Sequence, residues 1–272
     1  SRSNRTNGRK MTQDLTAKKA AAYLFTAMRQ RRALEELPSL CRPESLADAY
    51  AIQDCLVAMI GTPVGYKIAF TNSGIQRQMG VSEPAAGRLI ESRVFESPAE
   101  VDVSSLFRIG IESEFAFRMA HDLPVASAPY SRDAVVEAID VLLPAIEIVD
   151  TRYVDWVKCG ALQAIADNVF GSHWVAGEAI QDWRSLDLSA AEVVTRLNGL
   201  EVARGIGANV FDHPFDALTW LANDLANRGL GLRGGEVVTT GGLPLFPAIN
   251  VPVDAASITV GRDGTVTAEL AG

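Results

Sequence analysis

The chain has 272 residues, with 25 Lys or Arg against 33 Asp or Glu, so its formal net charge is −8 at pH 7. This acidic balance excludes nucleic-acid-binding modules whose affinity depends on a basic surface, and no nucleic-acid partner is expected. Hydrophobic residues make up 48% and charged residues 21% of the chain, which is ordinary for a globular protein and excludes general disorder.

The cysteines and the N-terminal segment bear on the cellular location. Cys41, Cys55 and Cys159 lack the spacing of a disulfide scaffold or a thiolate zinc site, which favours a cytoplasmic protein. No apolar run approaches the ~20 residues that a membrane-spanning helix needs, so no membrane partner is expected. Residues 1–11 lack the apolar core of a signal peptide and are predicted to be a disordered leader or an artificial extension.

Two helices are predicted at the start of the chain. The first covers residues 12–37 and ends at Pro38; its apolar residues recur at roughly helical spacing. The second covers residues 43–61, because Pro43 suits a first helical turn and an apolar stripe runs to Gly61. Together they define a predicted N-terminal helical region over residues 12–62.

Beyond residue 62 the chain consists mainly of short apolar or alternating runs, which are typical of strands. These runs cover residues 65–70, 108–119, 144–150, 236–242, 257–260 and 265–270. Asp263 and Gly264 between the last two runs form a hairpin signal. Helices are predicted over residues 131–142 and 214–229. The sequence therefore predicts an α+β fold in which residues 63–272 form a β-rich catalytic domain.

The run over residues 108–119 sorts its side chains onto two faces. Because successive side chains of a strand point to opposite faces, Glu112 and Glu114 share one face with Arg118, and the larger apolar residues lie on the other. A pair of carboxylates on one face indicates either a functional site or a sheet face exposed to solvent, and the pattern leaves both open.

Glu147 lies inside the apolar run LLPAIEIV at residues 142–149. A buried carboxylate needs a cation, a hydrogen-bond network or a metal as its partner. Together with Glu112 and Glu114 it would form an oxygen-rich site that suits Mg²⁺ or Mn²⁺ better than zinc. The alternative is an internal salt bridge from Glu147 to Arg152.

Lys67 is a cation within an otherwise apolar predicted strand. A desolvated lysine can act as an acid, a base or an anchor for a carboxylate, whereas a lysine on an edge strand extends its ammonium into solvent. His121, His173 and His213 lack the spacing of a zinc site and no GxSxG motif occurs, which disfavours zinc and serine hydrolases. His213, just ahead of a predicted helix, is expected to be a capping or packing residue.

Several motifs together carry a resemblance to a known family. They follow one another as GYKIAFTN at 65–72, RIGIESEFAF at 108–117, PAIEIVDTRYVDW at 144–156, ADN at 166–168 and GGEVVTTGG at 234–242. From about residue 15 to residue 270 the chain resembles the 2-keto-4-pentenoate hydratase and 4-oxalocrotonate decarboxylase family, which is related to fumarylacetoacetate hydrolase. The E-x-E motif followed about 35 residues later by PA-x-E is the most specific part.

The resemblance implies a fumarylacetoacetate-hydrolase-like body with mixed and antiparallel sheets, and a homo-oligomer. It also implies that Glu112, Glu114 and Glu147 hold Mg²⁺ or Mn²⁺, with Lys67 and Glu112 as catalytic residues. The substrate would be a small 2-oxo or 2-hydroxy acid, bound by Lys67, Thr71, Asn72, Arg118, Thr240 and Gly241. Relative to the family, the residues Phe70, Val169, Phe170, Leu243, Leu245 and Phe246 predict a more apolar pocket.

The function expected from the resemblance is a metal-dependent lyase that adds water to a 2-hydroxydienoate such as 2-hydroxypenta-2,4-dienoate. One alternative is decarboxylation of a 2-oxo-enedioate, with Arg118 holding the second carboxylate. Another is a catalytically inactive relative that binds a 2-oxo acid or a partner protein. A carbon–carbon bond hydrolase is disfavoured, because that chemistry needs a histidine-assisted water and no histidine can be placed for it.

Overall fold

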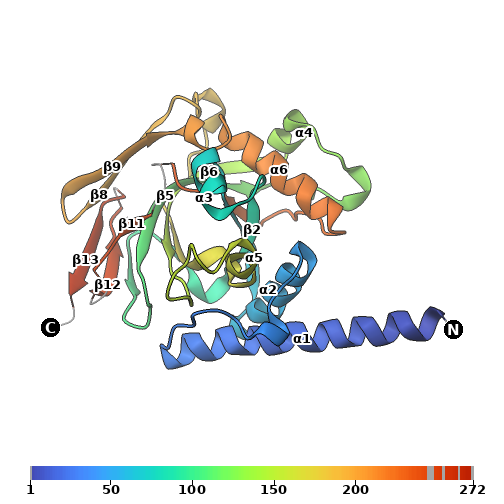
Figure 1. Cartoon of the computed structure of the whole chain (residues 1–272). Helices are drawn as coiled ribbons and strands as arrows, with labels where there is room; N and C mark the ends of the chain where they lie inside the picture. The colour runs from blue at the N-terminus through green and yellow to red at the C-terminus, as the bar shows by residue number, and fades with distance from the viewer. Residues whose placement is uncertain (1, 244–247, 253–254, 263, 271–272) are drawn as a thin grey trace.

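The computed structural model describes residues 2–243, 248–252, 255–262 and 264–270, in which two β-sheets are flanked by helices (Figure 1). Within these residues the larger sheet has eight strands and the smaller has five. Each sheet combines parallel with antiparallel strand pairs. The predicted α+β fold with mixed and antiparallel sheets is therefore confirmed.

The larger sheet has the strand order β2-β1-β10-β5-β6-β7-β3, with β11 paired to β5. Its strands are β1 (Pro63–Ala69), β2 (Ala85–Ile90), β3 (Val94–Glu96), β5 (Gly110–Met119), β6 (Ile139–Val149), β7 (Gly171–Ala176), β10 (Val237–Thr239) and β11 (Ile249–Asn250). The longest pairing joins β5 to β6 in antiparallel register. This pairing places residues 112 and 147 directly opposite each other.

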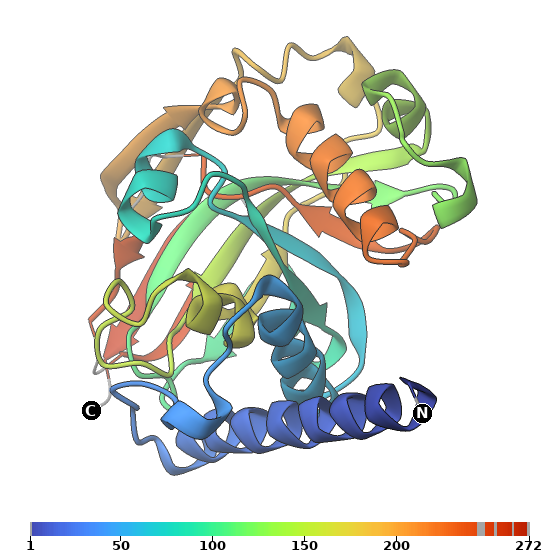
Figure 2. The same ribbon diagram turned by 45° about the vertical axis from the view of Figure 1, so that its right-hand side comes forward.

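The larger sheet is strongly curved, as Figure 2 shows. Leu89 of β2, Ala116 of β5 and Trp174 of β7 meet in one buried cluster, although β2 and β7 lie towards opposite ends of the strand order. The face of β5 that carries Glu112 and Glu114 therefore lines the inside of the curve. The alternative of a solvent-exposed sheet face is wrong for these two residues.

The smaller sheet has the order β4-β12-β13-β8-β9 and covers the outer side of the larger one. Its strands are β4 (Ala99–Asp102), β8 (Glu192–Leu197), β9 (Leu200–Ile206), β12 (Ala255–Val260) and β13 (Val266–Leu270). Ile258 packs there against Ile111 of β5 and Ile148 of β6. The predicted hairpin is confirmed as the antiparallel pair β12 and β13, whereas Asp263 of its turn lies outside the described residues.

The helices lie on two sides of the larger sheet. They are α1 (Arg2–Gln30), α2 (Leu46–Ile60), α3 (Ser73–Met79), α4 (Arg132–Glu137), α5 (Ala161–Ala166) and α6 (Pro214–Asn227). Helices α1, α2, α3 and α5 share one buried cluster, and α4 and α6 pack in another against β5 and β6 (Figure 1). Within the described part of the chain, no helix combines the length and apolar character needed to cross a membrane.

Local sequence explains where two of these helices begin. The Ser45 side chain accepts a hydrogen bond from the Asp48 N–H and caps α2, which ends at Gly61. His213 caps α6 by accepting a hydrogen bond from the Phe215 N–H, and Pro214 occupies the first turn. The predicted capping role of His213 is therefore confirmed.

Helices α1 and α4 differ most from their predicted boundaries. Helix α1 begins at Arg2, so it includes residues 2–11, for which a disordered leader was expected; no proline interrupts the helix there. It ends at Gln30 instead of residue 37, because Arg31 adopts a left-handed conformation with φ 49°. Helix α4 ends at Glu137 instead of residue 142, because residues from Ile139 onward pair with β5.

Candidate metal centre and cavity

Three carboxylates converge inside the curve of the larger sheet. Glu112 and Glu114 come from β5, and Glu147 lies opposite Glu112 on β6. One carboxylate oxygen from each residue lies within 4.8 Å of the others. Like charges placed directly opposite on paired strands repel each other, so this arrangement needs a compensating cation.

Burial strengthens the demand for a cation. The exposed fraction is 2% for Glu114 and 1% for Glu147, whereas Glu112 is partly exposed and lines a cavity. Burial raises the pKa of Glu147 to about 7, with Lys67 opposing and Glu112 adding to the shift. Burial also raises the pKa of Glu114 well above its usual value, and the neighbouring Glu147 and Glu112 raise it further.

In each of the two buried carboxylates, Glu114 and Glu147, one oxygen contacts a protein partner and the other has none. The Thr239 hydroxyl donates a hydrogen bond to Glu114 Oε2, and Lys67 pairs with Glu147 Oε1. Glu114 Oε1 and Glu147 Oε2 are buried without a hydrogen-bond partner among the described residues. Buried carboxylate oxygens without a protein partner are hard ligands, and they fit Mg²⁺ or Mn²⁺.

Lys67 stands beside the carboxylate cluster. It lies on β1 between β2 and β10, and its exposed fraction is 2%, so the edge-strand alternative is wrong. Its Nζ lies 3.1 Å from Glu147 Oε1 and donates to the Val169 carbonyl oxygen at 3.0 Å. Burial disfavours the ammonium, but the three glutamates outweigh this effect and raise the pKa of Lys67.

The proposed partnership of Glu147 with Arg152 is wrong. Arg152 instead forms a buried ion pair with Asp167, and it also donates to the Asp167 carbonyl oxygen at 2.6 Å. Lys67 takes the place beside Glu147 because the curvature of the sheet brings the side chain of this β1 residue to β6, although β10 and β5 lie between the two strands, whereas Arg152 lies beyond the end of β6.

We predict that Asp167→Asn lowers the free energy of unfolding by about 3–5 kcal/mol, because it leaves the Arg152 guanidinium buried without a counter-ion. Asp140→Asn is a matched control, since it breaks an ion pair with Arg118 whose side chains are 43% and 41% exposed. The control should cost less than about 1 kcal/mol. Urea unfolding of both variants measures the difference, and equal losses would contradict the expected importance of the buried pair.

A strained turn follows Asp167 and carries the Lys67 acceptor. Asn168, Val169 and Phe170 have φ angles of 54°, 46° and 63°, in a left-handed region that Val and Phe rarely adopt. The Asn168 side chain holds the turn by bonding the backbone N–H and carbonyl of Arg88. This geometry brings the Val169 carbonyl to Lys67 and the Phe170 ring to the cavity.

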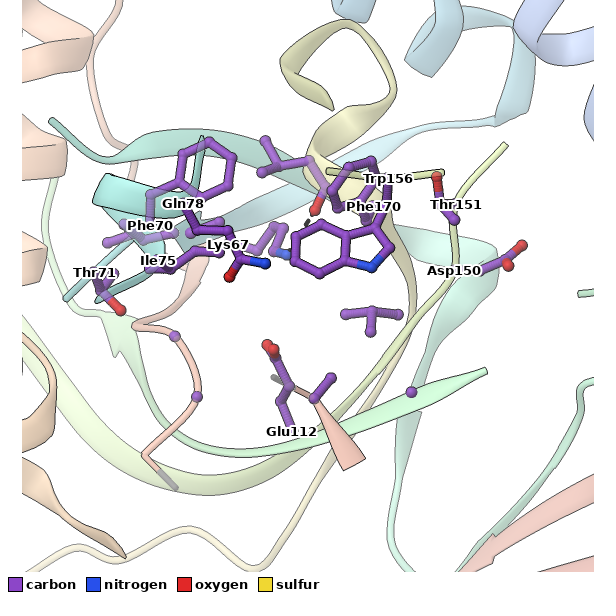
Figure 3. Close-up of a pocket in the computed structure, with 18 of the residues that line it drawn as sticks. Lys67, Phe70, Thr71, Ile75, Gln78, Glu112, Asp150, Thr151, Trp156 and Phe170 are labelled. Atoms are coloured by element: carbon purple, nitrogen blue, oxygen red, sulfur yellow. Dashed lines mark hydrogen bonds between the residues drawn. The ribbon is translucent and has the colours of Figure 1, made fainter. Parts of the chain in front are cut away.

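A cavity of about 310 Å³ opens above the carboxylate cluster (Figure 3). We call the part of its lining formed by Lys67 and Glu112 the floor, and the part formed by Phe70, Ile75, Trp156 and Phe170 the wall. Its lining includes Thr71, Asn72 and Gly241, which the resemblance gives as substrate-binding residues. A side chain at position 241 would collide with Thr71, because its Cβ would lie 2.6 Å from Thr71 Oγ1.

Other residues that the sequence predicted for the site lie outside the cavity lining or outside the described residues. Arg118 is outside the lining and pairs with Asp140 at 2.7 Å, because it sits at the far end of β5 from the cavity. Thr240 is fully buried and donates to the Phe115 carbonyl oxygen at 2.8 Å. Leu243 is buried in the main core, whereas Leu245 and Phe246 lie outside the described residues.

Sequence reasoning missed several residues that shape the site. Thr239, Asp167 and Trp156 belong to motifs that carried the resemblance, but no role was assigned to them. Asp167 had a usable signal, since an acid within the apolar run ALQAIADNVF needs a buried partner. The turn at residues 168–170 had no signal, because left-handed φ angles are not expected for Val or Phe.

His173 on β7 provides a pH-dependent prediction. Burial lowers the pKa of His173 to about 4 from 6.5, and Arg93 lowers it further. Between these values the unfolded chain binds a proton that the folded chain does not, so the free energy of unfolding should fall as the pH decreases from 6.5 to 4. His173 should contribute at most about 3 kcal/mol of this loss. The free energy of unfolding, measured with urea at pH 5 and pH 7.5, should depend less on pH in His173→Gln than in the parent chain. An identical pH dependence in the two proteins would refute the prediction.

Comparison with known proteins places the site in a family context. No protein-family model matches the chain. A 2-keto-4-pentenoate hydratase of Paraburkholderia xenovorans is 30% identical over 255 residues, covering 92% of this chain and 93% of that protein. A 2-hydroxyhexa-2,4-dienoate hydratase of Comamonas testosteroni is 33% identical over 232 residues, covering 83% and 87% of the two chains.

A solved structure shares the fold closely. The 4-oxalocrotonate decarboxylase of Pseudomonas putida G7, complexed with magnesium and adipate, superimposes with a TM-score of 0.81 and 26% identity. The match covers 93% of this chain and 96% of that one. With this fold, the ordered motifs and identities of 30% or more over most of the chain, the protein belongs to the 2-keto-4-pentenoate hydratase and 4-oxalocrotonate decarboxylase family.

Proposed function

We propose that the chain is a divalent-metal-dependent lyase that adds water to a 2-hydroxydienoate or related 2-oxo-enoate, such as 2-hydroxypenta-2,4-dienoate. The observation that carries the proposal is the buried convergence of Glu112, Glu114 and Glu147 beside Lys67 at the floor of one cavity. The hydratases among the relatives support the same reaction class.

Glu112, Glu114 and Glu147 would hold Mg²⁺ or Mn²⁺ through their carboxylate oxygens, and in Glu114 and Glu147 one of these oxygens has no protein partner. The bound ion would act as a Lewis acid towards the carboxylate and adjacent oxygen of a 2-oxo acid. Thr239 and Lys67 each fix one carboxylate of the cluster, so the ligand oxygens keep their orientation before any substrate enters. Glu112 is the cluster member that lines the cavity, and it would face the substrate.

Lys67 is our candidate for proton transfer. Hydration delivers a proton to carbon as water adds, so a group in the cavity must hold and give up that proton. The raised pKa keeps the Lys67 amine protonated in the metal-free chain. Of its three N–H bonds, one is directed to the Val169 carbonyl and one to Glu147, which leaves one for a ligand.

A metal-depletion assay tests this function. Protein treated with a chelator should lose its ability to remove the absorbance of 2-hydroxypenta-2,4-dienoate, and added Mg²⁺ or Mn²⁺ should restore it. Glu112→Gln should remain inactive at any metal concentration that restores the parent chain. Equal turnover with and without metal would contradict the proposed function.

Decarboxylation of a 2-oxo-enedioate is the second candidate, favoured by the structural match to 4-oxalocrotonate decarboxylase. Arg118 cannot hold the second carboxylate of such a substrate from its position on the protein surface. Release of CO₂ from an oxo-enedioate, without hydration of the dienoate, would favour decarboxylation. Turnover of either substrate would exclude a catalytically inactive binding protein.

A further inference from the structure

We propose that the aromatic wall of the cavity is a subsite for an apolar, preferably aromatic, substituent at the end of the substrate remote from its acid head. The inference rests on the proposed function, because that function assigns the acid head to the floor formed by Lys67 and the glutamates. It adds the chemical class of the substrate tail.

The wall is built from side chains of four separate segments. Phe70 follows β1, Ile75 lies on α3, Trp156 lies between β6 and α5, and Phe170 ends the strained turn. The Trp156 and Phe170 rings meet edge to face at a centroid distance of 6.1 Å. In Figure 3 these rings lie across the cavity from Glu112. Rings in this arrangement offer an apolar ligand both shape and dispersion contacts.

Two of these aromatic residues have a strained backbone conformation. Phe70 and Phe170 have φ angles of 61° and 63°, and a left-handed conformation costs about 1–2 kcal/mol for a residue with a side chain. Hydrogen bonds fix both residues: Gln76 donates to the Phe70 carbonyl at 2.8 Å, and Asp150 donates to the Phe170 carbonyl at 2.9 Å. Strain of this kind, held by surrounding contacts, is typical of functional sites.

The cavity is also large enough to hold a substituent at the remote end of the substrate in addition to its acid head. At about 310 Å³ it falls in the range of sites that enclose drug-sized ligands, roughly 300–1,000 Å³. An unsubstituted five-carbon acid held at the floor would leave the aromatic wall in contact with water. A phenyl or branched alkyl group would cover the wall and bury apolar surface.

The charges around the cavity disfavour an anionic tail. Among the described lining residues, the cations are Lys67 at the floor and Arg108, which is exposed to solvent. Neither belongs to the wall formed by Phe70, Ile75, Trp156 and Phe170, where a second carboxylate of the substrate would lie. Desolvating an unpaired carboxylate there would be costly.

A matched series of 2-hydroxydienoates tests the tail subsite. The members differ only at the distal carbon, which carries hydrogen, methyl, phenyl or carboxylate. We expect kcat/KM to rise about tenfold from hydrogen to methyl and further to phenyl, with carboxylate the poorest. Equal values across the series, or a maximum for carboxylate, would overturn the inference. Absence of turnover for every member would instead refute the proposed function.

Two variants connect the preference to the wall. Phe170→Gly removes a ring at a position whose φ angle suits glycine, so the ratio of kcat/KM between phenyl and hydrogen substrates should fall at least tenfold. Phe211→Gly is the control, because Phe211 also has a left-handed φ, 53°, but lies outside the lining. It should keep the ratio of the parent chain. An unchanged ratio in Phe170→Gly, or an equal fall in both variants, would contradict the subsite.

Discussion

Glu114→Gln should abolish Mg²⁺ or Mn²⁺ binding and reduce kcat/KM at least 100-fold, yet make the metal-free protein more stable. Glu114 is buried, and burial together with Glu147 and Glu112 raises its pKa well above the usual value. A neutral amide of the same shape removes that repulsion and can still accept the Thr239 hydrogen bond. A gain of about 1 kcal/mol or more is expected at pH 8.

The sign of this gain depends on pH. Because the folded-state pKa of Glu114 is raised, its carboxyl contributes most to stability when protonated, and that contribution is lost as the pH rises through the folded-state pKa. The advantage of Glu114→Gln should therefore be larger at pH 8 than at pH 5. Calorimetry with Mn²⁺ and urea unfolding with a chelator measure the two effects, with the exposed Glu137→Gln as the control. Retained metal binding in Glu114→Gln would contradict the proposed ligand set.

Lys67→Met should have the opposite effect on stability and a similar effect on turnover. It leaves Glu147 buried without its cation, which should cost the metal-free protein about 3–5 kcal/mol. Turnover should fall about 10²- to 10⁴-fold, because the group proposed for proton transfer is lost. Saturating Mg²⁺ should restore much of the stability, since the ion supplies the missing positive charge, but it should not restore activity.

Recovery of stability without recovery of activity distinguishes a catalytic role for Lys67 from a purely structural one. Lys67→Arg should not rescue turnover, because a guanidinium keeps its proton at all accessible pH values and cannot replace an amine in proton transfer. Lys158→Met, at an exposed position, is the control and should change neither property. Recovery of full activity by Lys67→Met in saturating Mg²⁺ would show that Lys67 only balances charge.

The sequence predicted the chemistry of the site better than its surroundings. Alternation along residues 108–119 placed Glu112 and Glu114 together, and the apolar context of Glu147 indicated a buried partner. Whether that face met solvent depended on the curvature of the sheet, which no local pattern encodes. Because strands from both ends of the sheet pack together, the face of β5 that carries the two glutamates lies inside the protein.

The sequence also did not determine which cation pairs with Glu147. Lys67 and Arg152 were both available cations for Glu147, and only the path of β1 through the curved sheet decides between them. Arg118 points to the same face of β5 as the two glutamates, but the strand is long enough to place Arg118 at the protein surface. The alternation of side chains predicts which face of the sheet a residue occupies, but it does not predict how far along the strand the site extends.

The most direct test of the metal centre is a crystal structure of the chain grown with Mn²⁺ and measured for anomalous scattering. We expect one strong peak bound by oxygens of Glu112, Glu114 and Glu147 at about 2.0–2.3 Å, with Lys67 still paired to Glu147. A peak at another position, or no peak while the three carboxylates keep their present arrangement, would contradict the central claim that this cluster is a divalent-metal site.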